Sequence, residues 1–146
     1  MGDKKIARAK VEWVEKEYLV GMTERGVKVP MESAPADVTP RGPTPKELVL
    51  QALAGCTLID VVSIIQKSRK KLEKCRVDVE AEVAAELPRA YKKIHLKYFF
   101  KSKDLTEAVA ERAIELSREK YCSVSAMLKG NVEITWSYEI KRTATD

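Results

Sequence analysis

The chain has 146 residues, of which 34% are charged and 45% are hydrophobic, and its formal net charge is +5. A chain of this length can bury a core without disulfide crosslinks, so we predict one domain over residues 1–146. Its basic residues are interleaved with acidic ones rather than gathered in a block, so we do not expect a nucleic-acid-binding protein.

Residues 1–6 include three charged residues, and no apolar run follows them. We therefore expect no secretory signal and a cytoplasmic protein. In a reducing cytoplasm, three cysteines are more often buried thiols, catalytic groups or metal ligands than stable disulfides. The Lys- and Glu-rich composition with few Asn and Gln is also typical of thermophiles, whose cytosolic proteins can carry disulfides, so both redox states stay open.

Alternating and short apolar runs predict three strands at the start of the chain, which we expect to form a meander. They lie at residues 5–14, 18–22 and 27–31. A loop over residues 34–45 follows, and its four prolines and one glycine cannot continue a helix or a β-ladder. Arg41 lies at the centre of this loop.

The most unusual apolar stretch spans residues 48–65 and predicts a helix over roughly residues 45 to 71, with Pro45 in its first turn. Its apolar side chains go almost all the way round, which is typical of a helix that is buried in a core or spans a membrane. Gln51, Asp60 and Ser63 interrupt it before about 20 apolar residues are reached. We therefore predict a central core helix and no membrane contact.

The second half of the chain predicts a hairpin, a helix and a last strand. Clean alternation at residues 76–83 and 92–100 favours an antiparallel hairpin with one buried face. Asp104 followed by Glu107 is an N-cap signature for a helix to about residue 120. Ser123 could cap a further short helix, and residues 131–140 alternate like a strand. This order of elements predicts an α+β fold.

Cys56 lies near the middle of the predicted core helix. One interpretation is that Cys56 is an inert thiol, because free cysteines are often buried and a thiol without an activating environment does not react. Activation requires a nearby cation or a helix N-terminus, and a mid-helix position supplies neither. Arg41 is the favoured cation because its loop leads directly into the helix, with Arg25 and Arg8 as alternatives.

Two acidic residues of the same predicted helix bear on Cys56. Asp60 lies four residues later on the same face, where its charge would raise the thiol pKa unless it has a partner of its own. Glu47 precedes Cys56 by nine residues, a rotation of about 180°. Glu47 can act on Cys56 only if the helix breaks or a second subunit supplies one of them. Otherwise it is a first-turn acid favoured by the helix dipole.

The remaining candidates are two cysteines and the single histidine. Cys122 follows a predicted helix and precedes Ser123, so it could sit at a helix N-terminus, where the dipole favours a thiolate. We interpret Cys75 as structural, and His95 should point to the polar face of its strand. The three cysteines and His95 include no closely spaced pair, so we expect no zinc site.

Three segments resemble the OsmC/Ohr family of thiol peroxidases, and the match extends from the early strands to the last one. They are TPKELVLQALAGCT at residues 44–57, DVVSI at residues 60–64 and EKYCSVSA at residues 119–126. The resemblance implies an OsmC-like α+β fold, with antiparallel sheets and a long buried central helix. It also implies an intertwined homodimer with two active sites at the subunit interface.

By the same resemblance, Cys56 corresponds to the peroxidatic cysteine and Cys122 to the resolving cysteine. The Cys56 thiolate would attack an organic hydroperoxide, with hydrogen peroxide as a second candidate substrate, and release the alcohol. The resulting sulfenic acid would condense with Cys122 to a disulfide, which an external dithiol reduces. Glu47 and Arg41 are the candidates for supporting charges. The resemblance implies no metal and no organic cofactor.

The chain differs from the better-studied peroxidases of that family directly after the motif proline. Those proteins have a glutamate there, whereas Lys46 follows Pro45 in this chain and the acid is Glu47. The pattern is similar to a less characterised OsmC-like branch. The leading hypothesis is a cysteine peroxidase for organic hydroperoxides. The alternative is a non-enzymatic OsmC-like dimer that binds a small apolar ligand in its interface pocket, with the cysteines as lining.

Overall fold

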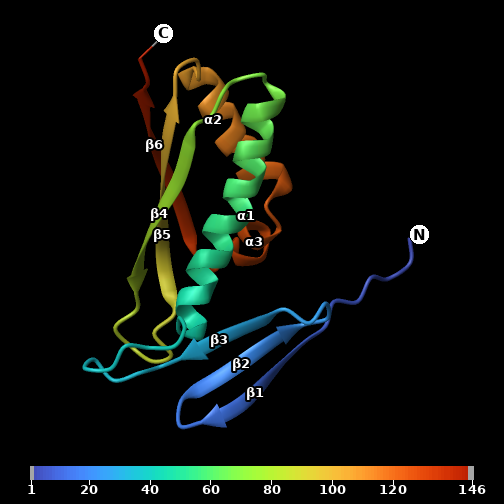
Figure 1. Ribbon diagram of the computed structural model, residues 1–146, viewed down its shortest axis with the longest axis vertical. Coiled ribbons are helices and arrows are strands. Elements are labelled where there is room, and N and C mark those ends of the chain that lie inside the picture. The colour runs from blue at the N-terminus through green and yellow to red at the C-terminus, as the bar shows by residue number, and fades with distance from the viewer. Residues whose placement is uncertain (1, 145–146) are drawn as a thin grey trace. The chain divides into compact units, whose positions relative to one another are not determined.

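The computed structural model describes residues 2–144 and confirms the α+β class. The chain forms two compact units, residues 1–49 and 50–146, each with a three-stranded sheet of its own (Figure 1). The expectation of a single domain over residues 1–146 stays a prediction.

The first unit contains the predicted antiparallel meander, in the order β1-β2-β3. Gly26 closes the β2–β3 turn with a φ of 82°, a left-handed conformation that glycine adopts without strain. Gly42 lies in the proline-rich loop where a Cβ atom would overlap the carbonyl of Pro30, so only glycine fits there. The strands are β1 (Ala9–Glu15), β2 (Tyr18–Thr23) and β3 (Lys28–Glu32).

Helix α1 (Pro45–Lys67) is the predicted core helix. Four of its residues, spaced four apart on one face, are buried: Leu53, Thr57, Val61 and Ile65. The helix ends four residues before the expected residue 71, because Arg69 adopts a φ of 60°, which cannot continue an α-helix. By length and composition alone α1 could cross a membrane, a criterion that the core helix of a soluble protein also meets.

The second sheet has the order β4-β5-β6 and is mixed. Strand β4 (Lys74–Val83) pairs antiparallel with β5 (Tyr91–Ser102), as predicted. Strand β6 (Glu133–Arg142) pairs parallel with β5, which corrects the expectation of purely antiparallel sheets. The chain crosses over through a helical segment, residues 107–128, before β6 begins, and such a crossover is what a parallel pair requires.

The core of the second unit lies between this sheet and the helices on one of its faces (Figure 1). The helices are α2 (Glu107–Leu116), the π-helix η1 (Ser117–Tyr121) and α3 (Ser123–Leu128), together with α1. Alternate residues of β5 point inward and are fully or almost fully buried: Ile94, Leu96, Tyr98 and Phe100. They pack with the buried stripe of α1 and with small residues of α2.

The structure corrects both predicted helix caps in this unit. Thr106 caps α2 by accepting the N–H of Val109 at 3.2 Å, whereas Asp104 accepts the N–H of Lys71 at 2.9 Å. Because Asp104 binds the backbone of Lys71, after the end of α1, it does not cap α2. The cap of α2 therefore lies two residues later, at Thr106. Cys122, not Ser123, caps α3.

Candidate functional site

The fold brings Cys56 and Cys122 together, although they are far apart in the sequence. Cys56 is half-buried on α1, and its sulfur lies 3.9 Å from the hydroxyl oxygen of Ser123, the first residue of α3. Cys122 is only 3% exposed, and its sulfur accepts the N–H of Ser125 at 3.4 Å as the cap of α3. The site therefore consists of α1 and the start of α3.

The environment of Cys56 favours its thiolate. Burial alone would raise the pKa of this thiol, but hydrogen bonds outweigh that effect and lower the pKa below its ordinary value. The donors are the backbone N–H of Val124, the thiol of Cys122, and the hydroxyl and N–H of Ser123. A thiolate, not a thiol, is the form that attacks electrophiles, so Cys56 is the candidate nucleophile.

The pKa of the Cys122 thiol is shifted in the opposite direction, above its ordinary value. Burial raises the pKa of its thiol, and the hydrogen bond and charge repulsion from Cys56 raise it further, although Ser125 acts in the other direction. The expected placement of Cys122 at a helix N-terminus is confirmed, but the expected preference of this residue for the thiolate is wrong. Of the two thiols, Cys56 is therefore the one that loses its proton at the lower pH.

A helix start, one of the two activating environments considered for Cys56, is present at its sulfur. A position in the middle of α1 has no free N–H groups, so we expected a cation to act on Cys56. The structure instead places the first N–H groups of α3, from Ser123 and Val124, at the sulfur of Cys56. The Cys-Ser-Val-Ser segment was recognised as a helix start, but nothing in the sequence indicates that this start faces α1.

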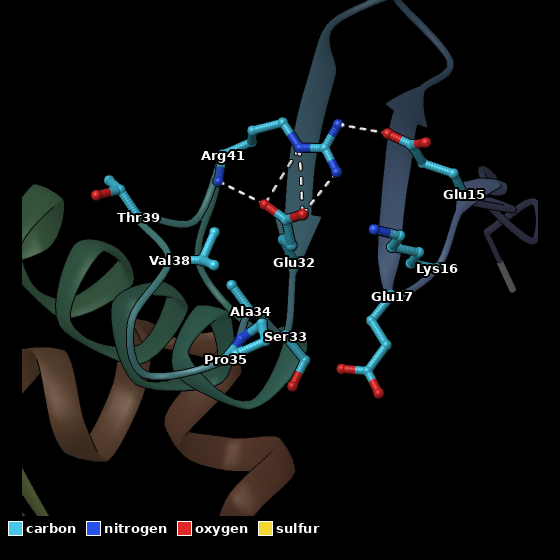
Figure 2. A pocket seen from close by; sticks show the side chains of 10 residues that line it. All are labelled: Glu15, Lys16, Glu17, Glu32, Ser33, Ala34, Pro35, Val38, Thr39 and Arg41. Carbon is cyan, nitrogen blue, oxygen red and sulfur yellow. Dashed lines mark hydrogen bonds and ion pairs between the residues drawn. The ribbon is translucent and has the colours of Figure 1, made fainter.

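Arg41 lies in the first unit and binds two carboxylates there (Figure 2). Its guanidinium contacts Glu32 at 2.6 Å and Glu15 at 3.0 Å, and it stacks on the ring of Tyr18 at 3.7 Å. The hydrogen bonds from Arg41 hold the pKa of Glu32 below its ordinary value. Arg41 and its two carboxylate partners line a cavity of about 790 Å³. The role of Arg41 toward Cys56 stays a prediction.

Glu47 stabilises the start of α1. Its N–H donates to the hydroxyl oxygen of Thr44 at 3.1 Å, and that hydroxyl donates to the Glu47 carboxylate at 3.0 Å. This arrangement resembles a capping box and agrees with the interpretation of Glu47 as a first-turn acid. Because α1 continues unbroken from Pro45 to Lys67, a second subunit is the route left by which Glu47 could act on Cys56.

Asp60 has the partner that its position near Cys56 required. The hydroxyl of Ser117 donates to its carboxylate at 2.9 Å. Ser117 also lies 3.0 Å from the hydroxyl of Thr57, which lies 2.7 Å from the hydroxyl of Tyr98. Sequence reasoning missed these three hydroxyl groups, because their spacing along the chain carries no sign of their contact.

The other sulfur and imidazole groups are placed elsewhere. Burial raises the pKa of Cys75 to about 11, which agrees with a structural role. His95 points to the polar side of β5 as expected, and its two ring nitrogens lie 2.7 Å from Thr135 and 2.8 Å from Ser137. Among residues 2–144, no three His, Cys, Asp or Glu side chains gather in a way that could hold a metal ion.

We predict that the cysteines differ in their reaction with iodoacetamide. At pH 7 Cys56 should be alkylated much faster than Cys75, because hydrogen bonds lower the pKa of Cys56, whereas burial raises the pKa of Cys75 to about 11. The Cys56 rate should stay high below about pH 8.5, the ordinary range of a cysteine. Mass spectrometry of peptides after timed alkylation measures both rates, with the denatured protein as the control. Equal pH profiles for the two thiols would contradict activation.

Comparison with known proteins places these features in context. A family model described as "OsmC-like protein" matches residues 37–137. Protein YhfA of Escherichia coli K12 is 41% identical over 133 residues, which covers 91% of this chain and 97% of YhfA.

Solved structures share the fold. A hypothetical protein from Aquifex aeolicus VF5 has a TM-score of 0.85 at 26% identity, covering 97% of this chain and 100% of its own. The organic hydroperoxide resistance protein OhrB of Bacillus subtilis has a TM-score of 0.62 at 16% identity, covering 90% of this chain and 98% of its own. At that identity the likeness to OhrB shows the fold alone.

Proposed function

This chain belongs to the OsmC-like protein family, and on that premise we propose that it is a cysteine-based peroxidase that reduces organic hydroperoxides to alcohols. The observation that carries the proposal is the division of roles between the two thiols. Cys56 has a lowered pKa and Cys122, hydrogen-bonded to it, has a raised one. A peroxidase that resolves its own sulfenic acid needs one thiolate to attack and a second thiol beside it.

The proposed reaction uses the sulfur atoms of the chain alone, without a metal or organic cofactor. The Cys56 thiolate attacks the outer oxygen of the hydroperoxide, the O–O bond breaks, and the alkoxide leaves and takes a proton to become the alcohol. Cys56 is then a sulfenic acid. The sulfur of Cys122 displaces its hydroxyl group, so that a disulfide forms and water leaves. An external dithiol returns two electrons and restores both thiols.

We also propose that the active form is a homodimer in which a second copy covers part of α1. This helix is apolar nearly all round, yet only four of its residues are buried, and Ile59 is 72% exposed. An exposed apolar helix face is unfavourable in water, and a second copy of the same chain would remove it. The same contact would supply the route by which Glu47 could reach a Cys56.

The decisive experiment is to oxidise the reduced protein with one equivalent of cumene hydroperoxide and, in parallel, of hydrogen peroxide. Mass spectrometry of peptides then identifies the oxidised residues at successive times. We expect a Cys56–Cys122 disulfide that forms faster with the organic peroxide, while Cys75 stays reduced.

If both thiols stay reduced while a known thiol peroxidase is oxidised under the same conditions, the peroxidase proposal is wrong. The alternative hypothesis, a non-enzymatic OsmC-like dimer that binds a small apolar ligand, would then be favoured. Size-exclusion chromatography with light scattering tests the dimer separately, and a monomer at micromolar concentration would contradict it.

A further inference from the structure

Three buried hydroxyl groups and one carboxylate form a continuous hydrogen-bonded chain next to the two cysteines. The hydroxyl groups of Tyr98 and Thr57 are 2.7 Å apart, those of Thr57 and Ser117 are 3.0 Å apart, and Ser117 is 2.9 Å from Asp60. Thr57, Ser117 and Tyr98 are each 0% exposed. The chain therefore runs from the core of the second unit to a half-buried carboxylate on α1.

Ser117 is the hydrogen-bond donor at the centre of this chain. Its hydroxyl donates to the carboxylate of Asp60 at 2.9 Å. The same Ser117 hydroxyl also points to the hydroxyl oxygen of Thr57, which accepts from it at 3.0 Å. The Thr57 oxygen lies in turn 2.7 Å from the hydroxyl of Tyr98. Burial raises the pKa of Tyr98 to about 12, so that this end of the chain keeps its proton. Removing the Ser117 hydroxyl therefore leaves the Asp60 carboxylate and the buried Thr57 oxygen without this donor.

Ser117 connects the segments that carry the two cysteines. Its side chain contacts Thr57, the residue directly after Cys56, and Asp60 one turn later. Its carbonyl oxygen accepts the N–H of Cys122 at 2.7 Å, the wide-turn hydrogen bond of the π-helix η1. Such π-turns occur frequently at functional sites. One residue thus ties the backbone next to Cys56 to the backbone of Cys122.

We propose that Ser117 is a positioning residue that holds Cys122 against Cys56 for formation of the disulfide. The inference rests on the proposed function and deepens it, because it assigns Ser117 to the second half of the reaction. Ser117 acts through Thr57, Asp60 and the N–H of Cys122, and its own atoms take no part in the chemistry.

The chemistry provides a direct measure of this positioning. The sulfenic acid on Cys56 has two fates. It reacts with the Cys122 thiol to give a disulfide and water, or with a second hydroperoxide to give a sulfinic acid and an alcohol. The share of each product reports how well Cys122 is placed, and a general loss of activity would not change that share.

The first experiment compares Ser117→Ala with the wild type and with Ser63→Ala, a control that removes a half-buried serine hydroxyl of α1. We expect the first oxidation of Cys56 by cumene hydroperoxide to keep its rate in all three. Disulfide formation in Ser117→Ala should be about tenfold slower, as expected for one lost buried hydrogen bond, with more sulfinic acid on Cys56. An unchanged product ratio, or an equal slowing of both steps, would overturn the proposal.

A pair of variants at Asp60 covers the case in which Ser117→Ala fails to fold. Asp60→Ala and Asp60→Asn both remove the charge, but only the asparagine keeps an oxygen that accepts the Ser117 proton. We therefore expect Asp60→Ala to shift the product ratio toward the sulfinic acid and Asp60→Asn to restore it. If both variants behave alike, the hydrogen bond to Ser117 does not position Cys122.

A measurement without peroxide separates this inference from the proposed function. The Cys56–Cys122 disulfide is equilibrated with reduced and oxidised glutathione, and the equilibrium constant is read from the fraction that is oxidised. Ser117→Ala should lower this constant about tenfold, whereas Ser63→Ala should not. If the wild type does not react with peroxides but the equilibrium constants still differ in this way, the proposed function is wrong and the positioning role of Ser117 stands. Equal constants for all three proteins would refute the role of Ser117.

Discussion

Replacing Cys56 with serine should reduce the consumption of cumene hydroperoxide to the level of buffer alone. The hydroxyl of a serine at this site is not ionised at neutral pH, so the donors from Ser123, Val124 and Cys122 have no thiolate to stabilise. Consumption of the hydroperoxide in the presence of a dithiol, followed by an iron-based colour assay, measures the effect.

The other two cysteines provide matched variants for this experiment. Without the dithiol, Cys122→Ser should reduce one equivalent of hydroperoxide per chain and leave a sulfenic acid on Cys56, and each further equivalent reduced should appear as sulfinic acid on Cys56. Cys75→Ser should behave as the wild type, because this thiol lies apart from the pair and its pKa is raised by burial. Turnover in Cys56→Ser equal to that of the wild type would refute Cys56 as the nucleophile.

Replacing Phe100 with alanine should lower the free energy of unfolding by about 3–5 kcal/mol, the range for a large aromatic residue removed from a core. Phe100 is 2% exposed and belongs to the core cluster of the second unit, where its ring lies 6.1 Å from that of Tyr98. Urea unfolding followed by circular dichroism, at equal protein concentrations, measures the change. Equal concentrations matter because an associating protein is more stable when it is concentrated.

The neighbouring Phe99 is the control for that substitution. It is half-buried on the other face of β5, where the side chains of Arg76 and Lys97 lie against its ring. Phe99→Ala should cost about 1 kcal/mol, the size of a cation–π contact near the surface. If the two variants are equally unstable, the assignment of the faces of β5 is wrong.

The faces of the sheet follow from the local pattern of residues. Successive side chains of a strand point to opposite faces, so the alternation from Ile94 to Phe100 is enough to assign the buried face. The direction of the neighbouring strand β6, in contrast, does not follow from such a pattern. Alternation in β6 indicates a strand but not its direction, and its parallel pairing with β5 depends on the path of the chain through the helices.

The start of α2 likewise depends on a tertiary contact as well as on the local sequence. Asp104 and Glu107 fit the spacing of a helix start, yet Asp104 binds the N–H of Lys71, and Thr106 is the cap. The competing donor belongs to a segment that is distant in the sequence. Local spacing identified the helix, and a tertiary contact decided where it begins.

The two reactive cysteines were recognisable from their surroundings in the sequence, but their chemical roles were not derivable from it. The motifs around Cys56 and Cys122 resemble a known family, and that resemblance implied the order of attack and resolution. The pKa of a thiol, however, depends on the donors within hydrogen-bond distance of its sulfur. For Cys56 those donors come from residues 122–124, which the sequence places far away.

By itself, the sequence determined the elements, the buried face of β5, the apolar helix α1 and the two cysteine motifs, because each depends on residues within a few positions of one another. Only the tertiary structure decided which backbone N–H groups stabilise the Cys56 thiolate and that Ser117 is the partner of Asp60. Hydrogen bonds act over about 3 Å, and only the folded chain brings such distant residues within that reach.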